Sequence, residues 1–512
     1  MGKPHPIGKV YLVGAGPGDL GLITLKGREC IEIADVVVYD YLSNKQMLAW
    51  AKPEAKLIYA GKKAKYHTLS QKGINDLLVE LAEEGNTVCR LKGGDPMIFG
   101  RGGEEAQELE QAGIPFEIVP GISSAIAGPI YAGIPVTHRD HCSMLTIFTG
   151  HEDPTKTESS IDYAKLAKLD GTKVMLMGVE RVRSVTEQLL EHGMDANTPV
   201  GLVRWATTGA QESITGELNN IADKIEAANF KSPAVAVFGG VVTLRDQINW
   251  FEKKPLFGKR VVVTRTRKQA GELSKRLADL GADVFELPTI KIEPPKDMMS
   301  FGKLVQDAHT YDWLIFTSPN GVEAFCEMFY KLYTDAREIG GVRIAAIGPG
   351  TAAKLKEYRF ATDLMPETSV AESLLETLEE GVGTLDNLKM LWVKAEVTRE
   401  VLSQHLKKKG VILDEAIAYR TVAESNDNAG AIERFKDEGA DVITFTSSST
   451  VEHFLELKLP LPERLKIASI GPITSRTLKT HGLYVDVEAE KHDIPGLVNS
   501  VIELCAQKPP ED

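Results

Sequence analysis

The first glycine-rich turn of the chain follows a short apolar run in the stretch VYLVGAGPGDLGLITLKG. A dinucleotide-binding turn has the pattern G-x-G-x-x-G, but here Gly14 and Gly16 are followed by Asp19 at the third glycine position. Pro17 removes a backbone donor from a turn that would have to bind phosphate through free N–H groups. Asp40, at the end of the next apolar run, stands where a ribose-binding acid would lie. A nicotinamide-dependent oxidoreductase is therefore disfavoured, although it stays an alternative.

A second glycine-rich loop, LKGGDPMIFGRGGEE, follows the apolar run TVCRL. Gly93 and Gly94 lack side chains, so the backbone can approach a ligand closely there. Pro96 favours an extended Asp95, whose carboxylate is suited to a cation, a ribose hydroxyl or an amino group. The alternative is a tight structural turn in which Asp95 caps the next helix.

A third stretch, VPGISSAIAGPIYAGIPVTHRD, combines small residues with the hydroxyl pair Ser123 and Ser124 and with the basic Arg139. The formal net charge of the 512-residue chain is −13, which argues against binding of bulk nucleic acid. That charge does not exclude a local basic pocket for an anionic small molecule.

The second half of the chain contains an internal duplication. The stretch DWLIFTSPNGVEAF, from residue 312, parallels DVITFTSSSTVEHF, from residue 441, and IAAIGPGTAAKL parallels IASIGPITSRTL downstream. The repeat predicts two similar α/β lobes, and in open α/β sheets the loops after the strands form the ligand site. These loops are rich in hydroxyl groups and glycine; the alternative is that their Ser and Thr residues only cap the following helices.

The elements that must position these loops are short apolar runs alternating with helical patterns along nearly the whole length. This alternation, which includes a helix capped by Ser70, predicts an α/β protein with mainly parallel sheets. The pattern breaks at FEKKPLF, residues 251–257, before the fresh strand RVVVTR. We therefore predict domains at residues 1–250 and 258–512, joined by this linker.

Cysteine spacing and hydropathy indicate the cellular compartment of the protein. The five cysteines form no CxxC pair and no zinc spacing, so we expect reduced thiols, no metal site and a cytoplasmic protein. No apolar stretch is long enough to span a bilayer, and the first ten residues lack the apolar core of a secretory signal.

The motifs of the first half, GAGPGDLGLITLKG, LKGGDPMIFGRGGEE and YAGIPVTHRD, together resemble uroporphyrinogen-III C-methyltransferase of the tetrapyrrole methylase superfamily. The resemblance covers about the first 245 residues. It implies two α/β lobes, a homodimer formed through this domain, and S-adenosylmethionine bound between the lobes. The implied reaction transfers two methyl groups to uroporphyrinogen III and gives precorrin-2.

The second half resembles uroporphyrinogen-III synthase from residue 258 to residue 512, through VVVTR, IFTSPNGV, IAAIGPGTA, AYRT, TFTSSSTV and IGPITS in the family's order. This family closes hydroxymethylbilane to uroporphyrinogen III, the substrate of the methyltransferase. The resemblance implies one lobe from about residues 258–289 and 424–512 and another from about residues 290–423.

The methylase resemblance implies roles for individual residues. Asp40 and Lys62 match the family's proposed proton acceptor and donor, although such groups also serve as a cap and as a solvated surface charge. Arg101, His138 and Arg139 are basic anchors for the eight carboxylates of the macrocycle, or members of internal ion pairs. The positions implied to contact S-adenosylmethionine are Pro17, Gly93, Gly94, Asp95, Ile98, Ser123, Ser124, Met177 and Ala206, where the last often is Gly in the family.

The synthase resemblance implies fewer chemical roles, because ring closure is facile and the protein must chiefly steer the folding of the chain. Tyr419 matches a family tyrosine proposed to help the terminal hydroxyl of hydroxymethylbilane leave. Hydroxyl groups expected to bind substrate carboxylates are those of Thr264, Thr317, Ser318, Thr446, Ser447 and Thr474.

Two further expectations concern the final product and the role of the C-terminal half. No stretch resembles the dehydrogenase–ferrochelatase module that carries some relatives on to sirohaem, so we expect precorrin-2 to be the final product. An alternative hypothesis is that the C-terminal half is a two-lobed ligand-binding module without catalytic activity.

Overall fold

The computed structural model describes residues 7–61, 69–151, 160–264, 267–287, 289–368, 370–398, 400–424 and 430–506. The chain divides into two compact units, one of residues 1–260 and 276–284 and the other of residues 261–275 and 285–512. Within these described residues, the strands form four sheets of five strands each.

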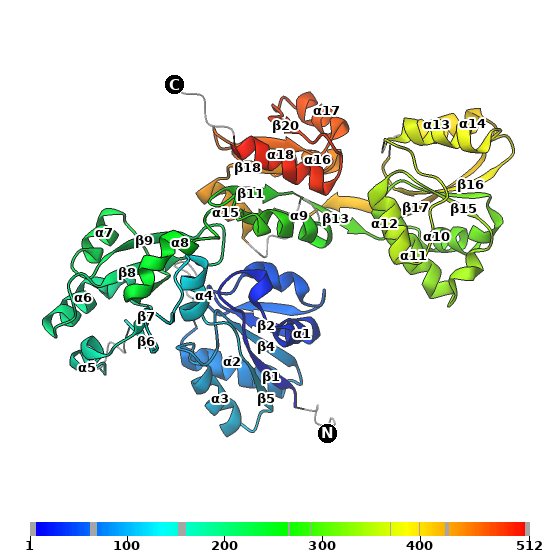
Figure 1. Cartoon of the computed structure of the whole chain (residues 1–512). Coiled ribbons are helices and arrows are strands. Elements are labelled where there is room, and N and C mark those ends of the chain that lie inside the picture. The colour runs from blue at the N-terminus through cyan, green and yellow to red at the C-terminus, as the bar shows by residue number, and fades with distance from the viewer. Residues whose placement is uncertain are drawn as a thin grey trace, which may run out of the picture. The chain divides into compact units, whose positions relative to one another are not determined.

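The first sheet is parallel throughout, in the strand order β3 (Lys56–Tyr59), β2 (Val36–Tyr39), β4 (Thr87–Lys92), β1 (Lys9–Gly14) and β5 (Phe116–Val119). Its helices are α1 (Leu25–Ile33), α2 (Gln71–Glu83) and α3 (Gly102–Gln111). Successive strand residues face opposite sides, so Val36 and Val38 pack with residues of α2 and α3 while Val37 packs with residues of α1. Burial on both faces explains why β2 is an unbroken apolar run. Ser70 caps α2, as expected. Figure 1 shows β1, β2, β4 and β5 with these helices.

The second sheet has the order β6 (Leu145–Thr149), β7 (Thr172–Leu176), β10 (Ala234–Phe238), β8 (Pro199–Arg204) and β9 (Glu212–Glu217). Only the β6–β7 pair is parallel, whereas β10 runs antiparallel to β7 and β8, and β8 to β9. The expectation of mainly parallel sheets does not hold here, because β8 and β9 follow one another as a hairpin without a crossover helix. The helices of this part are α4 (Ser124–Tyr131), α5 (Tyr163–Lys168), α6 (Val182–Glu191), α7 (Ile221–Ala227) and α8 (Arg245–Ile248).

The third sheet joins strands from the two ends of the second half. Its order is β12 (Asp283–Glu286), β11 (Arg260–Val263), β18 (Val442–Phe445), β19 (Lys466–Ser469) and β20 (Val487–Glu488). Its helices are α9 (Arg267–Asp279), α15 (Ala431–Glu438), α16 (Ser448–Glu456), α17 (Pro472–Thr480) and α18 (Ile494–Ala506).

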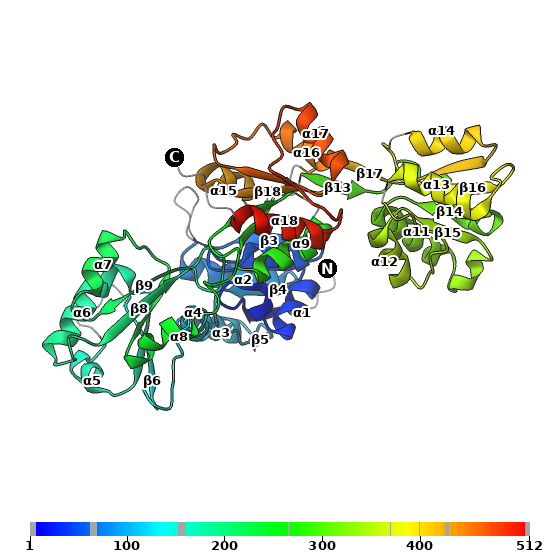
Figure 2. The same ribbon diagram turned by 45° about the horizontal axis from the view of Figure 1, so that its top comes forward.

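The fourth sheet has the order β13 (Ile290–Glu293), β17 (Ile412–Ala423), β16 (Lys389–Ala395), β14 (Trp313–Phe316) and β15 (Arg343–Ala346). Helices α10 (Met298–Gln306), α11 (Pro319–Leu332) and α12 (Pro349–Glu357) cover one face, and α13 (Ala371–Val382) and α14 (Val401–Lys408) cover the other (Figures 1 and 2). Both copies of the repeat form the same unit, a strand and helix followed by a parallel neighbouring strand and helix.

The stretch expected to be a linker, residues 251–257, packs at its start against the first unit. Phe251 is 3% exposed, and its ring lies 4.9 Å from that of Tyr131. Arg245 and the neighbouring Glu252 form an ion pair of 2.5 Å. The domain boundary itself stays a prediction.

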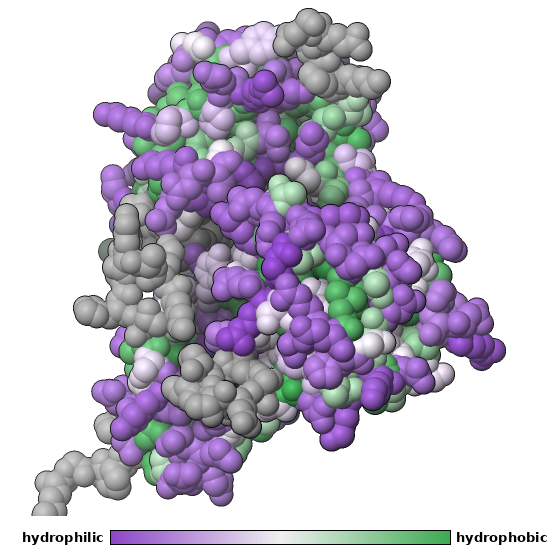
Figure 3. All heavy atoms as spheres, turned by 90° about the vertical axis from the view of Figure 1, so that its left-hand side faces the viewer, coloured by the Kyte–Doolittle hydropathy of each residue, from purple (hydrophilic) through white to green (hydrophobic). Residues whose placement is uncertain are grey.

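The surface is mainly hydrophilic on the face drawn in Figure 3, where hydrophobic side chains show as separate patches. Among the described helices, none combines the length and apolar character needed to cross a membrane.

Candidate functional site

Three glycine-containing loops meet beyond the carboxyl ends of β1, β4 and β5. Gly16 and Gly94 form an isolated backbone bridge, with the Gly94 N–H donating to the Gly16 carbonyl at 2.7 Å. A Cβ on Gly14 would lie 2.5 Å from the Gly121 Cα and 2.7 Å from the Gly94 carbonyl oxygen. Backbones this close exclude any side chain, so the glycines let the three loops come together at the edge of a parallel sheet, where ligands bind in such folds.

Asp95 fastens two of these loops to each other. The side chain is buried, and its Oδ1 accepts from the Met97 N–H at 2.8 Å while Oδ2 accepts from the Gly121 N–H at 2.9 Å. A Cβ on Gly94 would meet nothing nearer than the backbone of Ser123 and Ser124, at 3.7 Å or more. The structure therefore brings together Gly94, Asp95 and the hydroxyl pair, as a site shared by these loops requires.

Asp19, which breaks the dinucleotide pattern, connects the first glycine loop to α4 and to the loop that follows β8. Its backbone N–H donates to Thr207 Oγ1 at 3.0 Å, and its carboxylate accepts from the Gly21 N–H and from the Tyr131 hydroxyl at 2.8 Å. Burial and this hydrogen bond raise the pKa of Tyr131, so its hydroxyl remains a donor. A Cβ on Gly18 would lie 2.9 Å from Thr208 Cγ2. The loop of Pro17 therefore lies against the loop that follows Ala206.

Asp40 lies beside the same group of loops. Its Oδ1 accepts from the Leu42 N–H at 3.1 Å and from the N–H and hydroxyl of Ser43. A Cβ on Gly93 would stand 2.5 Å from Leu42 Cβ, so the Asp40 loop packs directly on the second glycine loop. Lys62, the expected proton donor, lies outside the described residues.

A buried ion cluster contacts the carboxylate of Asp40 and supports its loop. Lys92 Nζ lies 2.6 Å from Glu105 Oε1, Arg90 Nε lies 3.4 Å from the same oxygen, and an Arg90 amino group lies 3.8 Å from Asp40 Oδ2. Burial, followed by the positive charge of Arg90, lowers the pKa of Lys92. Sequence reasoning missed this cluster, although two cations two residues apart in the apolar strand TVCRLK were a signal for it.

Backbone strain concentrates in the loops of this unit. Nine non-glycine residues among those described have positive φ, and five of them lie after β4, β7 or β8: Phe99, Arg101, Met177, Trp205 and Thr207. Such conformations cost about 1–3 kcal/mol each and cluster at active sites and ligand clamps.

The remaining expected residues of the first unit lie on loops around this region. Ile98 and Met177 are exposed, whereas Ala206 is buried. Arg101 pairs with Glu104 at 2.6 Å, which lowers the pKa of Glu104. Arg139 is exposed, and the ring of the neighbouring His138 lies 5.1 Å from that of His141.

In the fourth sheet, three expected residues lie together: two directly after β14, and Tyr419 within β17 opposite the last residue of β16. The hydroxyls of Ser318 and Tyr419 are 3.0 Å apart, and Ser318 also caps α11 by accepting from the Gly321 N–H. Burial raises the pKa of Tyr419, against the effect of its hydrogen bonds. Thr317 Oγ1 accepts from the indole N–H of Trp392 at 3.1 Å, a partner that the sequence did not indicate.

In the third sheet, the expected hydroxyls are largely committed within the protein. Thr264 is fully buried and donates to the Thr444 carbonyl at 2.7 Å. Ser447 forms a capping box with Thr450 at the start of α16, which is the capping alternative stated above. Thr446 is partly exposed after β18, and Thr474 is buried in α17.

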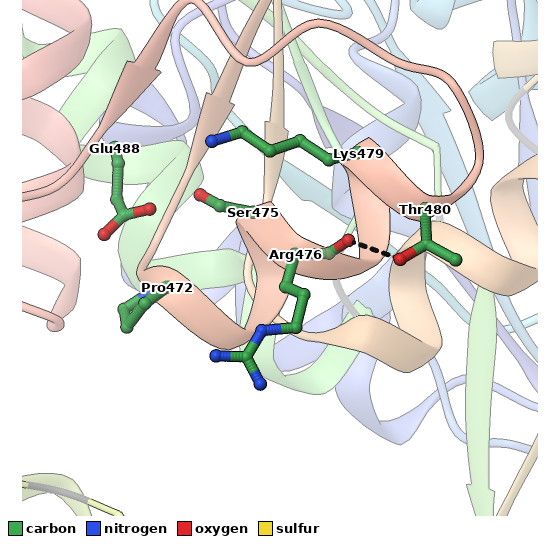
Figure 4. A pocket seen from close by; sticks show the side chains of 6 residues that line it. All are labelled: Pro472, Ser475, Arg476, Lys479, Thr480 and Glu488. Atoms are coloured by element: carbon green, nitrogen blue, oxygen red, sulfur yellow. Dashed lines mark hydrogen bonds between the residues drawn. The ribbon is translucent and has the colours of Figure 1, made fainter.

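An open hollow of about 460 Å³ lies beside α17 and β20, where Arg476 and Lys479 extend from the helix in different directions and Lys479 points toward the side of Glu488 (Figure 4). None of the expected hydroxyl residues lines it. We therefore do not assign this hollow to the reaction.

A separate ion cluster stabilises the fourth sheet at Glu415. Its carboxylate accepts from Lys394 at 2.8 Å, from Lys407 at 2.9 Å and from Ser403 at 2.7 Å. Burial raises the pKa of Glu415, but these hydrogen bonds outweigh it and lower the pKa to about 2. Among the described residues, no group of His, Cys, Asp and Glu is arranged to hold a metal ion.

The fold defines an α/β protein of two units with two sheets each, and the glycine loops of the first unit lie at the sheet edge where such folds bind small molecules. The family of tetrapyrrole (corrin/porphyrin) methylases matches residues 9–222, and the family of uroporphyrinogen-III synthase HemD matches residues 271–499. The chain belongs to the proteins that fuse these two families, so the resemblance inferred for each half is confirmed.

Two relatives known from their sequences agree with this assignment. A porphyrin biosynthesis protein HemD of Ruminiclostridium josui is 37% identical over 97% of this chain and 98% of its own length. An S-adenosyl-L-methionine-dependent uroporphyrinogen III methyltransferase of Methanosarcina barkeri is 53% identical over 47% of this chain and 94% of its own. Among solved structures, the chain is similar to uroporphyrin-III C-methyl transferase from Thermus thermophilus complexed with S-adenyl homocysteine. The sequence identity is 37% and the TM-score is 0.41, and the match covers 46% of this chain and 100% of that chain.

Proposed function

We propose that the chain is a bifunctional enzyme of tetrapyrrole biosynthesis. The C-terminal half closes hydroxymethylbilane to uroporphyrinogen III, and the N-terminal half transfers two methyl groups from S-adenosylmethionine to that product, giving precorrin-2. Membership of a family that joins the two activities in one chain supports both assignments.

The observation that carries the methyltransferase assignment is the meeting of the three glycine loops, clamped by Asp95. The small residues there suit a folded ligand that must approach the backbone closely. The residues that would hold S-adenosylmethionine are Pro17, Gly93, Gly94, Asp95, Ile98, Ser123, Ser124, Met177 and Ala206. Bound there, S-adenosylmethionine supplies an electrophilic methyl group, and positioning of the pyrrole carbon provides most of the rate.

Asp40 accepts the proton that the methylated ring must lose, because its carboxylate lies at the edge of the glycine loops with Oδ2 oriented toward Arg90. Arg101, His138 and Arg139 bind carboxylates of the macrocycle through charge-assisted hydrogen bonds. Lys62 remains the proposed proton donor.

In the second half, Tyr419 donates a hydrogen bond to the leaving hydroxyl of hydroxymethylbilane. Its contact with Ser318 at 3.0 Å holds the phenol hydroxyl beside the start of α11. The partly exposed hydroxyls of the neighbouring loops bind carboxylates and steer the chain toward closure with inversion of the last ring; they belong to Thr317, Ser318, Thr446 and Ser447.

We further propose that the protein forms a homodimer through its first unit, testable by light scattering, and that it is cytoplasmic. The scattered spacing of the five cysteines, which form no CxxC pair, supports the second point.

Two measurements test the proposed function. The pure chain is incubated anaerobically with uroporphyrinogen III and S-adenosylmethionine, and calorimetry compares binding of S-adenosylhomocysteine with binding of NAD. Formation of precorrin-2 and binding of S-adenosylhomocysteine alone support the proposal. Binding of NAD without methyl transfer would favour the oxidoreductase alternative.

A further inference from the structure

Two aromatic side chains from different sheets of the first unit face each other beside the proposed reaction centre. Tyr41 directly follows Asp40, and Trp205 directly precedes Ala206. Their ring centroids are 5.6 Å apart with an interplanar angle of 65°, an edge-to-face pair. Tyr41 is 50% exposed and Trp205 partly exposed, so both rings retain surface that a ligand can cover.

The backbone of Trp205 is held in a strained conformation that aims the ring. Its φ is +45°, which is rare for a bulky residue. The Trp205 carbonyl accepts from the Thr208 hydroxyl at 2.7 Å, and the Thr207 N–H donates to Gln211 Oε1 at 3.0 Å. Gln211 in turn donates to Glu252 at 2.9 Å. Strain persists only where surrounding contacts impose it, and it clusters at active sites and ligand clamps.

Contacts of its two chain neighbours hold the backbone of Tyr41. Its backbone lies between Asp40, whose Oδ1 accepts from the Leu42 N–H, and Leu42, which packs on Gly93. The aromatic pair therefore spans from the proposed proton acceptor to a proposed methyl-donor loop. A reacting pyrrole ring must lie between those same two groups.

We propose that Tyr41 and Trp205 form an aromatic wall against which one pyrrole ring of uroporphyrinogen III packs, so that its reacting carbon faces the methyl group. A pyrrole is a flat apolar ring with an N–H donor, and aromatic faces bind such rings by stacking and by accepting the N–H. Both residues are positioning residues, which act on the placement of the substrate and take no part in proton transfer. The inference rests on the proposed methyltransferase function.

The test uses the full chain with Trp205→Ala, Trp205→Phe and Tyr41→Ala, and Trp250→Phe as the matched control. Trp250 is also half exposed and in an aromatic cluster, but it packs on Tyr131 and Phe251. We expect Trp205→Ala and Tyr41→Ala to raise the KM for uroporphyrinogen III about tenfold. The Kd for S-adenosylhomocysteine should change by less than about twofold, and Trp205→Phe should restore most of the loss.

A second readout does not depend on the alanine variants folding. Anaerobic titration with uroporphyrinogen III should quench the tryptophan fluorescence of the wild type and of Trp250→Phe more strongly than that of Trp205→Phe. Equal quenching in all three, an unchanged KM, or equal weakening of uroporphyrinogen III and S-adenosylhomocysteine would overturn the inference. A wild-type chain that methylates no uroporphyrinogen III would instead overturn the proposed function itself.

Discussion

Gly93→Ala tests the geometry of the glycine loops, because a methyl group there meets a defined obstacle. The added Cβ would lie 2.5 Å from Leu42 Cβ and 3.1 Å from the Leu42 carbonyl carbon. Carbon atoms in contact are separated by about 3.5–4.0 Å, so one of the two loops must move by about 1 Å. Leu42 is two residues from Asp40 and Gly93 is two residues from Asp95, and a shift of about 1 Å at a reaction centre can cost about a hundredfold in rate.

We therefore expect Gly93→Ala to lower the kcat for methylation of uroporphyrinogen III about a hundredfold, measured as anaerobic release of S-adenosylhomocysteine. Closure of hydroxymethylbilane by the same variant should be unchanged, which serves as an internal control for folding. Gly73→Ala is the matched control, since its Cβ would meet Leu69 Cδ2 at an ordinary 3.5 Å within α2. A Gly93→Ala variant that methylates within about threefold of the wild-type rate would refute the reasoning.

Three further outcomes are expected. Asp40→Asn keeps the oxygen that accepts from Leu42, so it should lower the kcat of methylation by about a hundredfold or more while leaving calorimetric binding of S-adenosylhomocysteine intact. Tyr419→Phe should slow closure of hydroxymethylbilane about a hundredfold and raise the share of isomer I, resolved by chromatography, without affecting methylation. The pKa of Glu415 is lowered to about 2, so its stabilisation is full above its ordinary pKa of 4.5 and is lost as the pH falls toward 2. Glu415→Gln should therefore lower the free energy of unfolding by about 1–3 kcal/mol at pH 7, and by less than half of that at pH 3, in denaturant titrations.

The first sheet could be predicted from the sequence because its strands are buried on both faces and read as continuous apolar runs such as VVVY, residues 36–39. The second sheet could not be, since β9 is a half-exposed strand whose alternation with polar residues gives no sign of its partner or direction. The repeat of the second half carried more information, because two copies of one pattern must adopt one local fold.

The loops of the site could be located from glycine and hydroxyl patterns, but their contacts could not. Asp19 and Thr207 are 188 residues apart in sequence, and only the packing of the two sheets brings them within hydrogen-bond distance. The hydrogen bond from Thr264 to the Thr444 carbonyl could not be predicted either. A hydroxyl after a strand has the same sequence signature whether it binds a ligand or the neighbouring strand. The aromatic pair of Tyr41 and Trp205 could not be predicted either, because it depends on the packing of the two sheets and on the hydrogen bonds within the loops.

The most direct test of the central claim is a single anaerobic incubation of the pure full-length chain with hydroxymethylbilane and S-adenosylmethionine, with products identified by mass and by isomer. The account predicts precorrin-2, a dimethylated product of the type III isomer. Accumulation of uroporphyrinogen I alone would contradict the synthase assignment, and type III uroporphyrinogen without added methyl groups would contradict the methyltransferase assignment.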